Sequence, residues 1–346
     1  MDRRARYTRR EFLKMSGRAG AGLALLSSVR SSVNGSAVAP EAWVTRAQYL
    51  MGTVVTITAC GESRPHANEA ISRAFDEIRR VDEMMSLYKP ESQVSRLNRA
   101  AGREAIEVDP SVIEVIKHAR RFTVTTDGAF DITVEPFMEL WGFRSQQSLC
   151  EVPTETQIRD ALEAVGMKHV AVDDAEHSVA LLNRRTRIDL GSIAVGYSVD
   201  RAVEALRRSG IERAFINHSG DAYALGTAPE SDGWEIGIPD PSRPSEILAR
   251  FSLVDRAAST SGCYEKYVTI DGRGVGHILD PRTGSPGRAL LSATVFAPTA
   301  LETDALSTGF FCIEPEALHE VVKRANRLEL FAVTDDNEWA VIRSAQ

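Results

Sequence analysis

Cysteine is scarce in this sequence. Four cysteines occur in 346 residues, far apart and without a Cys-x-x-Cys pair. Such spacing supports neither a zinc site nor a disulfide framework. We therefore expect all four to be packing residues in the interior. Export would permit one disulfide, but the sequence favours no particular pair. The four are Cys60, Cys150, Cys263 and Cys312.

Long hydrophobic runs, internal repeats and low-complexity tracts are also absent. No apolar run approaches the roughly 20 residues that a membrane-spanning helix requires, so we expect no transmembrane segment. The chain is 43% hydrophobic and 26% charged, which is typical of a folded protein and not of a disordered one. Its length suffices for one large domain or two closely packed ones.

Positive charge is scarce outside the N-terminal segment. The first 34 residues hold eight Lys or Arg and two acids, whereas the rest holds 33 basic and 46 acidic residues. A body this acidic repels phosphate backbones, so we do not expect nucleic-acid binding. A phosphorylated ligand would need a metal ion to offset its charge.

The N-terminal segment has the pattern of a twin-arginine export signal. Arg9 and Arg10 are followed by Phe12 and Leu13 and by a mildly apolar run over 19–26. Small residues at 35–39 offer a cleavage site after Ala37 or Ala39. The alternative is a basic, disordered arm. We expect residues 1–39 to direct the protein to the periplasm, or to the outer face of the cytoplasmic membrane, and residues 40–346 to form the functional body.

Periodicity in the rest of the chain predicts an α+β fold. A first strand is predicted at Met51–Ile57. An amphipathic helix follows at 71–85, and residues 154–166 open with a capping box of Thr154 and Gln157. Strand-like runs dominate from residue 168 onward, and several are joined by short turns, which requires antiparallel pairing. We expect antiparallel sheets with helices packed on one side. Further helices are predicted at 111–125, 195–209, 300–312 and 315–326.

Asp304 and Thr308 are four residues apart within a predicted helix. Positions i and i+4 share one helix face, so a carboxylate and a hydroxyl would lie side by side. Both are hard oxygen ligands that suit Mg²⁺ better than zinc. Alternatively, Asp304 caps the start of the helix and Thr308 bonds back to the preceding turn.

A strand, a small-residue turn and a helix follow one another over residues 187–197. Backbone amides at such a helix start can hold a pyrophosphate, and the carbonyl of Ser192 can reach a metal ion. The segment lacks the spacing of a P-loop or of a dinucleotide fingerprint. As a lone glycine-containing turn, it is a weak signal.

Two further segments could carry chemistry. The turn fixed by Pro281 and Gly284 follows His277, and a strand end beside a charged turn is a suitable place for a general base. A lone histidine is nevertheless more often structural. Around Phe130, small residues over 126–134 could let a planar ring approach the backbone, or Phe130 could simply fill the core above a tight turn.

Together these segments resemble one family, the ApbE flavin transferases (FAD:protein FMN transferases). Eight stretches match in order over about 260 residues, and together they are far more specific than any one of them. They are Met51-Gly52-Thr53; Ser86 to Ser92 with Leu97-Asn98; Gly128 to Thr133; Asp189-Leu190-Gly191; Asn217 with Gly220-Asp221; Ser259 to Tyr264; His277 to Gly284; and Asp304 to Thr308.

The resemblance implies a periplasmic, Mg²⁺-dependent enzyme that uses FAD as substrate, joins FMN to a threonine or serine of a client protein and releases AMP. It implies that Ser192 (through its carbonyl), Asp304 and Thr308 hold magnesium and that His277 is the base. It also implies an FAD site lined by Met51, Tyr88, Ala129, Phe130, Asp131, Asp189, Val195 and Ile278.

Three positions depart from the family pattern. Val195 stands where members usually carry lysine, Ser219 where a second glycine is usual, and Thr303 where alanine is usual. The missing lysine removes a charged contact to FAD. Two other functions therefore remain open, an FAD pyrophosphatase that yields FMN and AMP, and a periplasmic FAD-binding protein without chemistry. The sequence identifies neither the client protein nor the oligomeric state.

Overall fold

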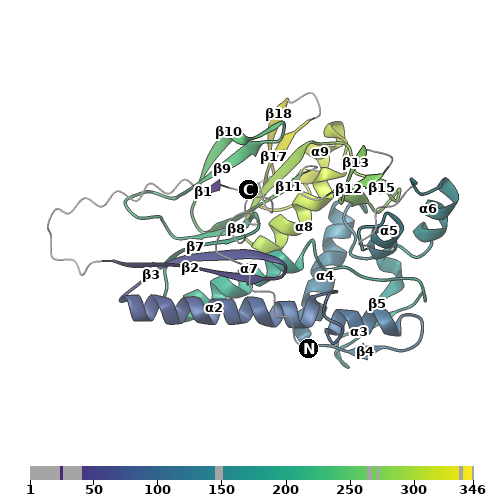
Figure 1. Cartoon of the computed structure of the whole chain (residues 1–346), viewed down its shortest axis with the longest axis horizontal. Coiled ribbons are helices and arrows are strands. Elements are labelled where there is room, and N and C mark those ends of the chain that lie inside the picture. Colours follow the sequence, from purple (N-terminus) through teal and green to yellow (C-terminus); the bar gives the residue numbers. More distant parts are fainter. Residues whose placement is uncertain are drawn as a thin grey trace, which may run out of the picture.

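The computed structural model describes residues 41–144, 151–262, 267–270, 273–334 and 338–344, together with the backbone of Ala24–Leu25. In these parts of the chain, no helix is both long and apolar enough to cross a bilayer. Figure 1 shows a broad sheet with long helices on one side and a smaller sheet on the other. The predicted α+β architecture of antiparallel sheets and packed helices is confirmed.

The broad sheet has eight strands in the order β18-β17-β16-β11-β8-β7-β3-β2, and every neighbouring pair is antiparallel. Short connections such as the β2–β3 and β7–β8 hairpins account for this pairing. The strands are β2 (Ala42–Leu50), β3 (Thr53–Gly61), β7 (Arg213–His218), β8 (Asp221–Leu225), β11 (Arg256–Gly262), β16 (Ser292–Ala297), β17 (Glu329–Val333) and β18 (Trp339–Arg343).

Helices α2 (Arg64–Met85), α7 (Ala194–Arg208) and α8 (Ala300–Phe311) cover one face of this sheet. The buried positions of α2 recur at helical spacing, from Ala67 to Met85, and face the β3 side of the sheet. Helix α8 differs, because it is buried on nearly every side between the sheet and α7. A carboxylate within such a helix must be satisfied by the protein or by a ligand.

The opposite face of the sheet is covered by β9 (Trp234–Asp240) and β10 (Arg243–Leu253). The core between the two sheets is rich in aromatic rings: Phe215 and Trp234 lie 5.2 Å apart between centroids, and Phe251 and Phe296 lie 4.6 Å apart. This layer contains no residue of the predicted site.

A second group of elements packs beside the helical face, at the right of Figure 1. It joins the same large core as α8, through Phe122 and Phe130 among others. Its helices are α3 (Gln93–Ala100), α4 (Pro110–Thr125), α5 (Glu135–Leu140), α6 (Glu155–Leu162) and α9 (Pro315–Val322), with a 3₁₀ turn at Met167–His169. Its strands are β4 (Ile106–Glu107), β5 (Val170–Asp173), β6 (Ser178–Leu181), β12 (Tyr267–Ile270), β13 (Arg273–Gly276), β14 (Leu279–Asp280) and β15 (Ser285–Pro286).

Several predicted boundaries were wrong. Met51 and Gly52 do not begin a strand but form the β2–β3 turn, with φ of 49° and 80°. The capping box of Thr154 is confirmed, but α6 ends at Leu162 and not at Gly166, which instead precedes the 3₁₀ turn. Strand β11 was not predicted as a strand, because its Ala, Ser and Thr residues carry no clear apolar alternation.

The cysteine prediction is tested only in part, and the export prediction is not tested. Cys312 is buried as expected, Cys60 is half-buried, and both are free thiols; Cys150 and Cys263 lie outside the described residues. Within the predicted signal, the structure describes β1 (Ala24–Leu25), which pairs with β9. The rest of residues 1–39 lies outside the described chain, so export remains a prediction.

Candidate functional site

The site is organised by the crossing of α7 and α8. The backbone amide of Gly196 donates to Asp304 Oδ2 at 2.8 Å. A Cβ atom at position 196 would lie 2.1 Å from the carbonyl oxygen of Ala300 and 2.8 Å from Cβ of Asp304, so the helices approach this closely only because residue 196 is glycine. Asp304 therefore lies beside the first turn of α7, directly after the turn that contains Ser192.

A second carboxylate fixes the same crossing. Asp200 of α7 accepts hydrogen bonds from the backbone amides of Ala300 (2.7 Å) and Leu301 (2.9 Å), at the start of α8. It thus satisfies two amides that a helix start leaves without intrahelical partners. Burial raises the pKa of Asp200 to about 7. The helices are held together at two points, at the start of α8 and one turn further along it at Asp304.

Asp304 and Thr308 lie on one face of α8, as their spacing predicted. Asp304 is 6% exposed, and the helix is capped by Thr299, so Asp304 does not have the alternative role of N-cap. The Thr308 hydroxyl donates to the Asp304 carbonyl at 3.2 Å, which is the back-bonding that the structural alternative expected. That bond leaves the hydroxyl oxygen able to accept a further interaction.

A row of hydroxyl groups connects this face with the sheet. Ser261 Oγ lies 3.4 Å from Thr308 Oγ1 and 3.0 Å from Ser307 Oγ, which in turn lies 3.3 Å from Ser259 Oγ. Ser259 contacts Asp221, whose pKa burial raises to about 7. Among the described buried side chains, Asp221 Oδ1 is one of four polar atoms without a hydrogen-bond partner. The polar row makes this an oxygen-rich region inside an apolar core.

The ligand chemistry around Asp304 fits magnesium. In the described residues no three His, Cys, Asp or Glu side chains gather as a metal cluster. A carboxylate, a hydroxyl and a backbone carbonyl are hard oxygen donors, and Mg²⁺ is commonly held by one or two carboxylates plus waters and substrate phosphates. Ser192, Asp304 and Thr308 are such a set.

A charged cluster holds two of the predicted FAD-site residues together. Arg144 donates to the Tyr88 hydroxyl at 2.9 Å and to Glu135 Oε1 at 2.7 Å, and it forms ion pairs with Glu135 and Asp189. Asp189 also accepts from the amide of Gly191 at 2.7 Å. The Tyr88 side chain is 80% exposed, with the guanidinium over its ring. Arg144 thus connects the loop after α2 with the turn before α7.

Sequence reasoning missed Arg144 and Glu135. Arg144 follows the Trp141-Gly142-Phe143 stretch but belongs to no spacing pattern, so no sequence signal singled it out. Burial raises the pKa of Glu135 to about 7, and the hydrogen bonds from Arg144 oppose that shift. One guanidinium faces two carboxylates here, so the cluster carries a net negative charge when both are ionised.

The segment around Phe130 is a tight turn with its aromatic ring in the core. Asp127 and Gly128 have φ of 51° and 82°, and Ala129 and Phe130 are each 1% exposed. Asp131 is buried and accepts from the Thr133 amide and hydroxyl and from the Met167 amide; burial raises its pKa. Ala129 and Phe130 are therefore almost inaccessible, and their place in an FAD site remains a prediction.

His277 follows β13 and precedes a rigid turn, as predicted. The amide of Gly284 donates to the Asp280 carbonyl at 2.8 Å, and Trp141 Nε1 donates to the Gly284 carbonyl at 2.8 Å. His277 is half-buried and Ile278 is buried. The role of His277 as base remains a prediction.

The other predicted residues border the same region. Met51, in the β2–β3 turn, packs against both the α8 core and the α2–α7 core. Val195 is half-buried in the first turn of α7, next to Gly196. The β7–β8 hairpin carries Ser219 with φ of 58°, in the left-handed region that favours glycine. The departure at Ser219 is therefore a strained backbone position.

Comparison with known proteins identifies the family of the chain. The model of the ApbE family matches residues 51–332. The chain belongs to the ApbE family. The FAD:protein FMN transferase of Escherichia coli K12 is 31% identical over 293 residues, which cover 83% of each chain. A transferase of the same name from Haemophilus influenzae is 31% identical and covers 84% of each chain.

Solved ApbE structures share the fold. The ApbE protein of Thermotoga maritima superposes with a TM-score of 0.79 at 32% identity, over 87% of this chain and 97% of that one. The flavin transferase ApbE of Vibrio cholerae gives a TM-score of 0.76 at 27% identity, over 88% and 98% of the two chains. The ApbE resemblance that the sequence motifs indicated is thus confirmed over nearly the whole described body.

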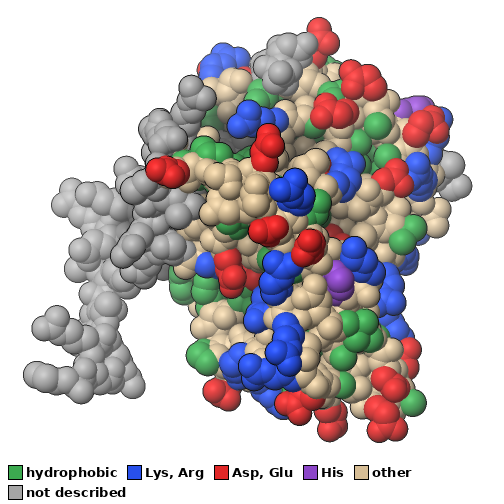
Figure 2. Space-filling view, turned by 90° about the vertical axis from the view of Figure 1, so that its right-hand side faces the viewer, with side chains coloured by type: hydrophobic (Ala, Val, Ile, Leu, Met, Phe, Trp, Pro, Cys, Tyr) green, Lys and Arg blue, Asp and Glu red, His purple; other side chains and the backbone are tan. Residues whose placement is uncertain are grey.

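The end of the ApbE fold that carries α3, α5 and α6 has its own charge pattern. Figure 2 shows Lys and Arg side chains gathered across the middle and lower part of this face, although the chain as a whole has a net charge of −7.

Proposed function

We propose that this protein moves the FMN half of FAD onto a threonine or serine hydroxyl of a client protein, in a magnesium-dependent reaction that releases AMP. The observation that supports this most is the hydrogen bond between Gly196 and Asp304, since it sets the oxygen ligands of α8 beside the helix start of α7. Membership of the ApbE family, whose curated relatives are named FAD:protein FMN transferase, makes the chain an enzyme that transfers a phosphorus-containing group.

Ser192, through its carbonyl, Asp304 and Thr308 would hold the magnesium ion. When bound, such an ion neutralises charge on a pyrophosphate and on the phosphoryl group being transferred. The protein has a net charge of −7, so it supplies little overall positive charge for that task. The two α7–α8 hydrogen-bond contacts hold α8, which carries Asp304 and Thr308, against α7.

The flavin nucleotide would lie along Tyr88 and Asp189, with Arg144 fixing both side chains. Val195 borders this region without contributing a charge. The absence of a lysine there is the observation that favours the second candidate function, an FAD-binding protein without chemistry. An FAD pyrophosphatase would use the same residues with water as the nucleophile.

His277 would act as the base. It takes the proton of the client hydroxyl while that oxygen forms a bond to the FMN phosphorus and the bond from this phosphorus to the AMP oxygen breaks. A threonine hydroxyl is a poor nucleophile at neutral pH, and a general base commonly contributes about 10² to 10⁴-fold in rate. Protonated imidazole cannot accept the proton, so transfer should fall at acidic pH.

One assay separates the three functions. The full chain is incubated with FAD and Mg²⁺, with and without a candidate client. Transfer gives a client that stays fluorescent after denaturation, together with AMP; hydrolysis gives AMP without a client; a binder gives neither.

Asp304→Ala should slow transfer at least about a hundredfold. His277→Ala should abolish transfer while FAD affinity stays within a few-fold. Wild-type rates in EDTA or in either variant would contradict the proposal.

We further propose that residues 1–39 export the folded chain through the twin-arginine route to the periplasm. The motivation is the Arg9-Arg10 pair with its weakly apolar continuation. Replacing both arginines with lysine should leave full-length precursor in the cytoplasm, as judged by fractionation and immunoblotting. Normal periplasmic recovery of that double variant would overturn the assignment.

A further inference from the structure

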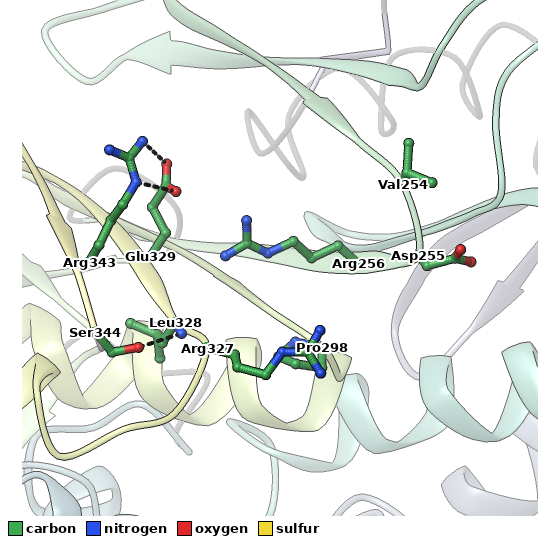
Figure 3. A pocket seen from close by; sticks show the side chains of 9 residues that line it. All are labelled: Val254, Asp255, Arg256, Pro298, Arg327, Leu328, Glu329, Arg343 and Ser344. Carbon is green, nitrogen blue, oxygen red and sulfur yellow. Dashed lines mark hydrogen bonds and ion pairs between the residues drawn. The ribbon is translucent and has the colours of Figure 1, made fainter. Parts of the chain in front are cut away.

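A cavity of about 540 Å³ lies at the end of the broad sheet where α8 begins, at the other end of that helix from Thr308. Its walls come from the β10–β11 turn, the loop after β16, the start of β17 and the end of β18 (Figure 3). Strand register explains how they meet, because Glu329 pairs with both Phe296 and Arg343. Arg256 lies five residues along β11 from Ser261, or about 17 Å, so this cavity is separate from the hydroxyl row around Thr308.

Three guanidinium groups line this cavity, those of Arg256, Arg327 and Arg343. In Figure 3 the Arg256 side chain extends toward the pair of Arg343 and Glu329, while Arg327 lies below it beside Pro298. Arg343 donates to Glu329 at 2.9 Å and 3.4 Å, so its charge is neutralised.

The other two cations have no acidic partner. Arg256 donates to the carbonyl of Phe296 at 3.2 Å, and neither it nor Arg327 forms an ion pair with any residue that the structure describes. The remaining acid of the wall, Asp255, accepts from the Gly226 amide at 3.0 Å and lies 3.7 Å from Arg207, which is outside the cavity. Two positive charges therefore remain to be matched.

This arrangement costs the protein electrostatic energy. Burial lowers the pKa of Arg256; Glu329 opposes that shift, and the neighbouring charges of Arg327 and Arg343 add to it. Like charges that face one another in a partly desolvated cavity repel, and an anion between them would remove the repulsion. Three arginines converge here although the chain has a net charge of −7.

We propose that this cavity binds a small phosphorylated organic molecule, with its phosphate between Arg256 and Arg327. A phosphomonoester carries close to two negative charges at neutral pH, which matches the two unpaired guanidiniums, whereas a single carboxylate carries one. The guanidinium fork also suits bidentate contact with phosphate oxygens. The cavity volume lies within the range of small-molecule sites and exceeds what inorganic phosphate needs. Val254 and Leu328 offer apolar surface to the rest of the ligand.

Calorimetric titration of the full chain tests this proposal. AMP, inorganic phosphate and adenosine are titrated in EDTA into protein saturated with FAD, so that the flavin site is blocked. AMP should bind saturably, phosphate more weakly, and adenosine not at all. Arg327→Gln and Arg256→Gln should each weaken AMP binding about tenfold or more. Arg250→Gln is the matched control, because it removes an exposed arginine of β10 that is paired with Glu235 of β9. This control should change binding less than about twofold.

The proposal is overturned if neither AMP nor phosphate binds at millimolar concentration, or if Arg327→Gln binds AMP as the wild type does. Arg327 is exposed, so its replacement tests the site even if Arg256→Gln fails to fold. The outcome is independent of the flavin proposal. Asp189→Asn should weaken FAD binding without affecting AMP in the arginine cavity, and the arginine variants should do the reverse.

Discussion

The α7–α8 crossing and the Arg144 cluster both position residues of the candidate site, but by different means. At the crossing, backbone amides of Gly196, Ala300 and Leu301 meet two buried carboxylates, and a missing side chain permits the approach. In the Arg144 cluster, one long side chain joins two loops, and Tyr88 is largely exposed. The first arrangement is rigid because backbone and helices define it. The second can rearrange whenever one rotamer changes.

Breaking the crossing should have the largest effect. Gly196→Ala would place a methyl group 2.1 Å from the Ala300 carbonyl, so α7 and α8 must separate. We expect a loss of about 1–3 kcal/mol or more in the free energy of unfolding, together with loss of Mg²⁺-dependent activity. Urea denaturation and the transfer assay measure the two effects. Glu204→Ala, at an exposed position of the same helix, is the control. A stable, fully active Gly196→Ala would show that the helices tolerate separation.

Breaking the Arg144 cluster should affect the free energy of unfolding and the FAD affinity in ways that a double variant can tell apart. Arg144→Gln leaves the buried Glu135 facing Asp189 without a cation, which should cost about 3 kcal/mol in unfolding free energy. The double variant Glu135→Gln/Arg144→Gln removes the unpaired charge and should recover most of that stability. FAD affinity, measured by flavin fluorescence, should remain weakened about tenfold in both, because Tyr88 and Asp189 are no longer held.

The matched control for the Arg144 variants is Arg185→Gln, which removes an exposed arginine paired with Glu163. It should alter neither stability nor FAD affinity noticeably. Recovery of FAD affinity in the double variant would show that Arg144 acts only by neutralising Glu135 and does not position the flavin-site residues.

The titration of Asp200 should make the stability of the α7–α8 crossing depend on pH. Its pKa is raised from 3.8 to about 7 by burial, so the folded protein keeps a proton that the unfolded chain loses. The raised pKa of Asp200 therefore makes the free energy of unfolding fall as the pH rises, by at most about 2.7 kcal/mol between pH 5 and pH 7. Asp200→Asn keeps one acceptor oxygen and cannot titrate, so its unfolding free energy should decline less over that interval. Parallel pH profiles for variant and wild type would contradict the assignment.

The smallest expected effect lies at the β7–β8 hairpin, outside both regions. Ser219 has φ of 58°, and glycine adopts this conformation without steric cost. Ser219→Gly should raise the free energy of unfolding by about 1 kcal/mol, measured from the urea midpoint. Ser209→Gly, at φ of −88°, should instead destabilise the protein. Equal shifts in the two variants would mean that backbone strain at Ser219 is not the cause.

Sequence patterns identified the parts of the site that depend on local spacing. The i, i+4 relation of Asp304 and Thr308 needed only a helix, and the turn at Gly284 needed only its glycine and proline. The capping box of Thr154 was likewise local. Arg144 could not be found in this way, because its partners Tyr88, Glu135 and Asp189 come from three separate segments and an arginine in a loop has no characteristic spacing.

The sequence by itself determined the long helices, the antiparallel pairing and the family, since short turns, periodicity and ordered motifs are local properties of a chain. Only the tertiary structure decided that Gly196 lies against Ala300 and Asp304, that Arg144 joins two loops, and that Arg256, Arg327 and Arg343 share a cavity. Packing brings together residues more than a hundred positions apart, such as Gly196 and Asp304. Such contacts depend on which helix faces and strand ends meet in the fold, which no local pattern specifies.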